Sequence, residues 1–314
     1  MKLDEDQDLK ELLRNPQFSE TDLSGKVMKR LYAGAGQSGK ERFLVKYKVS
    51  VLVIAGMLLT ASSGFAAVQY QSLKNKQGEV TYQVKPLKEA PTYEEEELQR
   101  LRISRDLGDK LLQEGSAAIF YVVAHNPKGE MDTRFKPVTF TDLTKLRSKL
   151  SSQPVVIADS LTDNYTFKSA RVFFEPVNMV NPPTPEEEAA TAEKLRKQAE
   201  ASNQEYAMMP VELSSQLLNI RTVYAQGKNE IAVTIVKSKG EYTAYVDEKV
   251  EFISEKVVVD GVEMIYTRYK GGNNITWTAE VPGSTELYQY QIDDMSGQSL
   301  SKADMIEIAK LYLK

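Results

Sequence analysis

The sequence predicts an α+β protein with a short helical N-terminal tail, one transmembrane helix and an external curved antiparallel sheet packed with helices. Three observations predict this arrangement. An uncharged apolar run lies at 49–68, alternating strand patterns follow one another between 206 and 294, and capped helical segments flank those strands. Because no long helical crossovers separate the strand patterns, we expect the sheet to be antiparallel.

The composition limits the classes of function. The chain has 314 residues and a formal net charge of -4, whereas a dedicated nucleic-acid binder should show a basic face. It has no cysteine, which removes disulfides, cysteine-ligated zinc and thiol nucleophiles. Its one histidine, His125, argues against a zinc enzyme, because such sites draw several ligands from His and Cys. We therefore expect no metal, no cofactor and no nucleic-acid partner.

The run at 49–68 reads "VSVLVIAGMLLTASSGFAAV" and carries no charge. Twenty residues at helical rise span about 30 Å, the thickness of the hydrocarbon core of a bilayer. A buried core helix and a cleaved signal peptide are the alternatives. A signal peptide begins at the very start of a chain, but here residues 1–48 precede the run. The sequence favours an uncleaved anchor, which makes the lipid bilayer a partner.

The distribution of Lys and Arg predicts the orientation of this anchor. Six of them lie within the twenty residues before the run, and four lie within the twenty after it. The prediction is a cell-membrane, single-pass protein with a cytoplasmic N-terminus and an extracytoplasmic C-terminal domain. Its parts are a tail at 1–48, the span at 49–68, an extended linker at 69–92 and the external domain at 93–314.

The N-terminal tail contains an apolar stripe at helical spacing, formed by Leu23, Val27, Met28 and Leu31. A short amphipathic helix of this kind suits docking on a cytoplasmic protein partner in a helix-in-groove manner. A disordered tail is the alternative. The skeleton G-x-x-x-x-G-K at Gly34 to Lys40 resembles a phosphate-binding loop. A helical pattern precedes it and Glu41 follows the lysine, so we interpret it as a flexible joint.

The external part begins with a helix at about 93–114. Further segments follow in order: a strand at 117–124, a short helix at 140–150, a strand at 165–177 and a helix from Thr184 to about Ala201. Thr184 and Glu187 form a capping-box pattern around Pro185. Successive strand patterns then lead to a closing helix, which Ser301 caps.

No catalytic constellation stands out, and we expect no enzyme. "SLSK" from Ser299 to Lys302 matches the S-x-x-K signature of serine acyl-enzymes, but its companion elements are missing and serine is also an ordinary helix cap. The one tryptophan, Trp277, is a core anchor or a ligand platform. With Tyr266 and Tyr288 it forms our candidate platform on the sheet.

The external part resembles a known family in several stretches: "DNYTFKSARVFFEP", "VVVDGVEMIYTRYKGGNNITWTAE", "YQYQI" and "LSKADMIEIAKLYL". They are similar to a domain of unknown function, the 4367 family, found in membrane proteins of endospore-forming Gram-positive bacteria. The resemblance covers 140–314 and is interrupted by a helical insert at 184–205. Some such proteins look like anti-sigma factors, and "ETDLSGKVMKRLY" resembles the short helix of their tails. The zinc signature His-x-x-x-Cys-x-x-Cys of one anti-sigma class is missing here.

The resemblance implies a sensing or binding domain outside the cell, in an anti-sigma-type signalling regulator whose tail holds a sigma factor. Its external ligand is unknown. The alternative is a membrane-tethered cell-envelope binding module for lipid or peptide without signalling, because the family is also similar in outline to lipoprotein-carrier folds.

Overall fold

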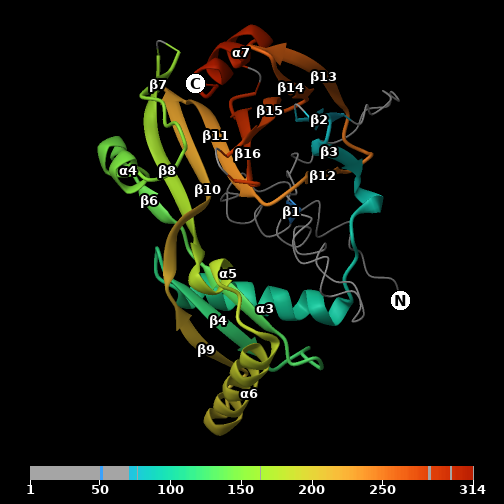
Figure 1. Ribbon diagram of the computed structural model, residues 1–314, viewed down its shortest axis with the longest axis vertical. Coiled ribbons are helices and arrows are strands. Elements are labelled where there is room, and N and C mark those ends of the chain that lie inside the picture. The colour runs from blue at the N-terminus through green and yellow to red at the C-terminus, as the bar shows by residue number, and fades with distance from the viewer. Residues whose placement is uncertain are drawn as a thin grey trace.

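The computed structural model describes residues 50–51 and most of the chain from residue 71 onward (Figure 1). The described residues are 50–51, 71–75, 77–162, 164–281, 284–297 and 299–313. They are mostly β-sheet, with 45% in strands and 24% in helices. The predicted α+β class with a transmembrane helix is therefore wrong. The strands form three separate sheets instead of one.

The largest sheet has nine strands. Its order is β13-β14-β15-β16-β11-β10-β8-β6, with β7 paired to β8, and all of these pairs are antiparallel. The bounds are β6 Val138–Phe140, β7 Ser160–Leu161, β8 Tyr165–Pro176, β10 Leu213–Gln226, β11 Asn229–Ser238, β13 Phe252–Val259, β14 Val262–Tyr269, β15 Gly272–Glu280 and β16 Leu287–Asp294. Short turns join β10 to β11, β13 to β14 and β14 to β15. Asp260 (φ 50°) and Gly261 (φ 81°) form the left-handed pair that a two-residue hairpin needs.

One face of this sheet is apolar and carries two helices. Along one cross-strand row, Ile220, Ile235, Tyr290 and Trp277 lie side by side, and all are buried. Helices α4 (Leu143–Lys149) and α7 (Lys302–Lys310) cover this face, because their apolar side chains belong to the same core cluster (Figure 1). The period of two along each strand explains why these residues share a face.

The opposite face of the sheet is polar. The next cross-strand row places Arg221, Thr234, Gln291 and Thr276 side by side. A four-stranded sheet contacts this face. Its order is β1-β12-β3-β2, with β1 Ser50–Val51, β2 Ser72–Lys74, β3 Val80–Pro86 and β12 Tyr242–Val246, and the 3-10 turn Leu87–Glu89 follows β3. A hydrogen bond of 2.7 Å between the hydroxyls of Thr81 and Thr278 joins β3 to β15.

A second layered unit lies at the other end of the molecule (Figure 1). Its three-stranded sheet has the order β5-β4-β9, formed by β4 Ala117–Val122, β5 Met131–Phe135 and β9 Tyr206–Val211. The central strand β4 is buried on both faces because helices cover both. One face packs on Leu195 and Ala199 of α6 (Pro185–Ser202), and the other packs on Leu107 and Leu112 at the end of α3 (Glu95–Leu111).

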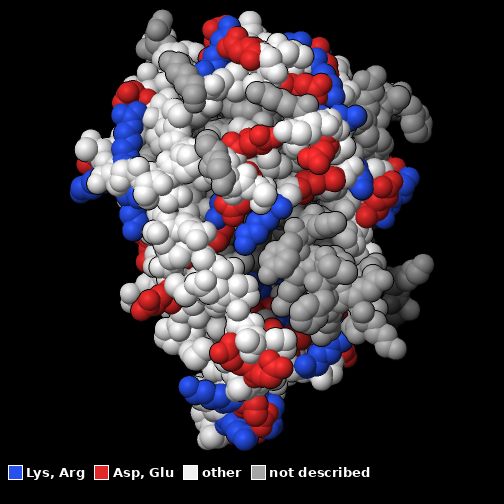
Figure 2. Space-filling model, viewed as in Figure 1, with Lys and Arg blue, Asp and Glu red and all other residues white. Residues whose placement is uncertain are grey.

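The two units are joined by long strands. β9 ends at Val211 and β10 begins at Leu213, so one nearly continuous stretch of extended chain runs from the small sheet into the large one (Figure 1). A short helix, α5 (Val177–Val180), follows β8 at the same level. At the foot of the molecule, α6 exposes both signs of charge (Figure 2), because Arg196 pairs with Glu193 and Glu200 along its surface.

The prediction of a single-pass membrane protein is a further point that the structure corrects. Among the described residues, no helix is long and apolar enough to cross a membrane. Most of 49–68 lies outside the described residues. Within it, the described pair Ser50–Val51 forms strand β1, which pairs in parallel with β12. Valines and isoleucine at the start of this run favour extended chain as much as a helix. The cell-membrane localisation and the orientation that depended on this helix are corrected with it.

The prediction of one antiparallel sheet is also wrong. β12 pairs in parallel with β3, with Tyr242 opposite Tyr82 and Val246 opposite Pro86. The rule that antiparallel pairs need only short turns describes strands that follow one another along the chain. These two strands are distant in sequence, so the rule did not constrain them.

Candidate ligand-binding groove

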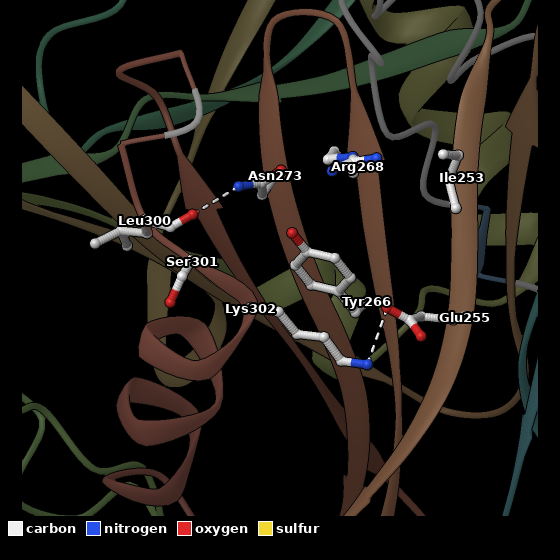
Figure 3. Close-up of a pocket in the computed structure, with 8 residues that line it drawn as sticks. All are labelled: Ile253, Glu255, Tyr266, Arg268, Asn273, Leu300, Ser301 and Lys302. Atoms are coloured by element: carbon white, nitrogen blue, oxygen red, sulfur yellow. Dashed lines mark hydrogen bonds and ion pairs between the residues drawn. The ribbon is translucent and has the colours of Figure 1, made fainter.

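A half-open groove of about 450 Å³ lies where α7 begins, on the apolar face of the large sheet near its β13 end. We call it the β13–α7 groove. Its lining residues are Ile253, Glu255, Tyr266, Arg268, Asn273, Leu300, Ser301 and Lys302 (Figure 3). Three neighbouring strands and the first residues of one helix supply these side chains, so the fold brings together positions separated by up to fifty residues.

Strand register explains why the sheet residues meet. Ile253 of β13 lies opposite Arg268 of β14, and Arg268 lies opposite Asn273 of β15. Glu255 and Tyr266 form the neighbouring row two residues along. Side chains two positions apart share a face, so both rows point into the groove.

Lys302 closes one end of the groove. Its Nζ lies 2.9 Å from Glu255 Oε1 and 5.9 Å from the centre of the Tyr266 ring (Figure 3). Both groups of the ion pair are partly exposed, so the pair adds little stability. Burial raises the pKa of the Tyr266 hydroxyl, while the charge of Arg268 opposes that shift. Tyr266 therefore remains a neutral phenol at neutral pH, and Lys302 is already paired.

The start of α7 supplies backbone donors. Ser301 is the N-cap, and its hydroxyl accepts from Asp304 N at 3.2 Å, while Asp304 Oδ2 accepts from Ser301 N at 2.8 Å. Hydrogen bonds that the hydroxyl of Ser301 and then its backbone amide donate to the Asp304 carboxylate lower the pKa of that carboxyl. The backbone amides of Lys302 and Ala303 belong to the first turn of α7, so no carbonyl within the helix can accept a hydrogen bond from them. They carry the positive end of the helix dipole at the rim of the groove.

Asn273 lies at the other end of the groove and is only 2% exposed. Its Nδ2 donates to the carbonyl of Leu300 at 2.9 Å, and so fixes the chain that enters α7. Its Oδ1 is buried and has no hydrogen-bond partner among the described residues. A buried acceptor without a donor is costly, but it does not attract an anion, and the Nδ2 of Asn273 is taken by Leu300.

Arg268 is the cation that the groove leaves available. Its side chain is exposed, and it makes no hydrogen bond or ion pair with the described residues. Figure 3 shows it beside Asn273, at the end of the groove away from Lys302. A guanidinium presents several donors in a planar fork that matches a carboxylate or phosphate. The arrangement can therefore hold an oxyanion at Arg268 within the groove.

The three sheet residues singled out from the sequence occupy different positions. Tyr266 lines the groove. Trp277 is 0% exposed and stacks on Tyr290, with ring centres 5.0 Å apart and planes at 8°. Tyr288 is buried, and its ring meets Tyr290 edge-on at 6.4 Å. The fold therefore brings only Tyr266 to the candidate site and leaves Trp277 and Tyr288 in the core.

Other residues singled out from the sequence have structural partners or lie elsewhere. Ser299 donates to Asp294 Oδ1 at 3.1 Å, and Lys302 pairs with Glu255, so the S-x-x-K pair does not meet. His125 occupies a left-handed turn after β4, with φ of 56°. The docking stripe Leu23, Val27, Met28 and Leu31 lies outside the described residues, as does the glycine-rich stretch after it.

Sequence reasoning missed Arg268 and Asn273. The signal that could have found Arg268 is its spacing from Tyr266, which puts both on one face of a strand that otherwise buries apolar residues there. Asn273 gave no such signal, since its role depends on the chain before α7. The part of the chain that the structure describes contains no group of three or more His, Asp or Glu side chains that could hold a metal ion.

The comparisons with known proteins leave this groove to be interpreted from its own chemistry. No family model, no curated protein and no solved structure matches the chain.

Proposed function

We propose that the described part of the chain is a binding module, and that its β13–α7 groove holds a ligand bearing an oxyanion, either a carboxylate or a phosphate. The observation that carries the proposal is Arg268, an exposed guanidinium that lines the groove and has no partner among the described residues. Ser301 and Lys302 at the start of α7 line the same groove, and a helix start favours the same charge.

Binding, and not catalysis, is the better account of these groups. The amine of Lys302 is held by Glu255, and the hydroxyl of Ser301 is held in the helix cap. The carboxylates that hold them, Asp304 and Glu255, serve the helix cap and the ion pair. The groove also differs from an acyl-chain site, because polar and charged groups line it together with Ile253, Tyr266 and Leu300. This chemistry favours an anionic ligand over the lipid alternative.

The test is a titration of the full chain with sodium acetate and, separately, with inorganic phosphate, followed by backbone and arginine side-chain NMR signals. We expect saturable shifts at the Arg268 Nε–H and at the amides of Lys302 and Ala303. The two anions distinguish a carboxylate site from a phosphate site.

Arg268→Gln tests the proposed contact, and Lys270→Gln is the matched control because Lys270 is an exposed cation two residues away that does not line the groove. We expect Arg268→Gln to weaken binding about tenfold or more, since a charge-assisted hydrogen bond contributes at least about 1.4 kcal/mol. Lys270→Gln should leave the affinity nearly unchanged. Equal losses in both variants, or no saturable shift with either anion, would refute the proposal.

A further inference from the structure

We propose that the ligand of the β13–α7 groove is an acidic peptide in extended conformation, which adds as a strand to the free edge of β13 and places a carboxylate side chain on Arg268. This inference rests on the proposed function and names its ligand. It begins from the position of β13 at the end of the nine-stranded sheet.

Among the described residues, β13 has a hydrogen-bonded neighbour on one side only, which is β14. The backbone N–H and C=O groups of an edge strand that point away from the sheet are a template for another strand. The groove opens beside this edge, because Ile253 and Glu255 of β13 form its outer wall. A strand added to β13 would therefore run along the rim of the groove.

The side chains of β13 support an added strand. Val258 is 69% exposed and Ile253 is 56% exposed, the two largest values among the exposed large apolar residues of the described chain. Positions of odd separation along a strand point to opposite faces, so the two lie on opposite sides of the sheet. No single helix or loop laid on one face would cover both. A strand laid along the edge contacts both, one on each side.

A second copy of this chain suits the edge poorly. Two copies that pair antiparallel through β13 are related by a two-fold axis normal to the sheet. This axis places residues of the same face opposite each other. Registers centred on the middle of β13 then put Glu255 opposite Glu255, or Lys256 opposite Lys256. Like charges directly opposite each other destabilise a strand pair. Central charges of this kind are how edge strands avoid pairing with themselves. The edge therefore favours a partner with a different sequence.

The charge of the groove selects an acidic partner. An added strand would lie about 5 Å beyond β13, so it would lie about 10 Å from β14, which carries Arg268. A glutamate beside Ile253, pointing to the groove face, would reach over Ile253 to meet the long side chain of Arg268 in the same row. The next groove-facing position lies beside Glu255, where a second acidic residue would be repelled. The structure therefore favours one acidic side chain with neutral neighbours on that face.

The probe is the peptide acetyl-Val-Thr-Val-Glu-Val-Thr-Val-amide, whose blocked ends leave glutamate as its only carboxylate. Isothermal titration calorimetry with the full chain measures its affinity. We expect Glu→Gln in the peptide and Arg268→Gln in the protein each to weaken binding about tenfold. The two changes together should cost little more than one, because they remove the same contact. Lys270→Gln should have little effect. Independent losses that multiply would show that the carboxylate lies elsewhere.

Two N-methylated peptides test strand addition itself. In each, alternate residues carry the methyl group, so that all the lost N–H donors lie on one edge of the extended peptide. A peptide paired with β13 through one edge tolerates methylation of the outer edge and loses binding when the inner edge is methylated. Equal affinities of the two methylated peptides would overturn strand addition.

The results separate this inference from the proposed function. If acetate shifts the Arg268 signal while the peptide does not bind, or while the two methylated peptides bind equally well, the peptide inference fails and the proposal of anion binding remains. If neither acetate, phosphate nor the peptide reaches Arg268, both fail.

Discussion

Asn273 of β15 donates a hydrogen bond from its side-chain amide to the backbone carbonyl of Leu300, at 2.9 Å. Asp294, in the neighbouring strand and directly opposite Asn273, accepts from the backbone amide of Leu300 at 2.8 Å. Two side chains of one cross-strand row therefore hold both polar groups of the same residue. This residue leads into α7, so the position of the helix start over the groove is set by the sheet.

Asp294→Ala should lower the free energy of unfolding by about 2–4 kcal/mol, because Asp294 is fully buried and accepts from Ser296, Ser299 and Leu300. Asp294→Asn should cost less, since one acceptor oxygen remains. Urea unfolding followed by circular dichroism measures both. Asp109→Ala, at an exposed position, is the control and should change stability by less than about 0.5 kcal/mol. If the unfolding curve of Asp294→Ala coincides with that of the wild type, these bonds do not stabilise the fold.

Trp277 should be protected from collisional quenching in the native protein. It is the one tryptophan of the chain, it is fully buried, and it stacks on Tyr290. Acrylamide and iodide should quench its fluorescence weakly in buffer and strongly in denaturant. Acetate or the acidic peptide should change this little, because Trp277 does not line the groove. Strong native quenching that the peptide suppresses would instead make Trp277 a ligand platform.

Lys237 and Glu175 should be strongly coupled. Lys237 Nζ lies 2.8 Å from Glu175 Oε1, and both side chains are buried. A second carboxylate oxygen, Glu286 Oε1, lies 3.5 Å from the same Nζ. Lys237→Met leaves the carboxylate of Glu175 buried without its partner and should cost about 3–5 kcal/mol. Adding Glu175→Gln should recover part of that loss. The exposed pair Lys256–Glu263 is the control cycle, with a coupling below about 1 kcal/mol. Similar coupling in the two cycles would contradict this expectation.

Asp293 should make the protein less stable as pH rises. Burial raises the pKa of its carboxyl, against the opposing effects of Arg221 and of the hydrogen bond from Gln291. The folded state then keeps a proton that the unfolded state has already lost. The stabilisation is full below the unfolded pKa, near 3.9, and is lost as pH rises through the higher folded pKa. Urea unfolding at a series of pH values, for the wild type and Asp293→Asn, measures this.

The difference in unfolding free energy between wild type and Asp293→Asn should shift in favour of the variant as pH rises. The variant lacks the titrating group, so any pH dependence that remains in it belongs to other residues. A difference that is flat, or that favours the wild type at higher pH, would contradict the raised pKa.

Helix ends were predictable because their signals are local. Thr184 and Glu187 form the capping box of α6, and Ser301 and Asp304 form that of α7, as their spacing predicted. The buried face of α3 was not predictable. Leu107 packs against β4, but the buried residues of this helix are Arg100, Ser104 and Gly108.

Partners distant in the sequence explain that result for α3. Arg100 pairs with Asp132 at 2.6 Å and Glu130 at 2.7 Å, and both belong to the region of β5, some thirty residues away. A buried arginine is stable only with such partners, and no pattern within the helix predicts them. The groove was unpredictable for the same reason. It consists of two cross-strand rows and a helix start, and none of its residues is distinctive alone.

The pairing of Tyr82 with Tyr242 has a consequence for how the protein is made. When β3 leaves the ribosome, its partner β12 lies 160 residues further along the chain (242 − 82). At about 5–20 residues per second, β3 waits roughly 8–32 seconds for that partner. During this interval a strand whose core tyrosine is destined for burial has an unpaired side, which is the kind of edge that chaperones shield and that misassembles when they do not. The rate of synthesis therefore sets how long this side of β3 stays unpaired.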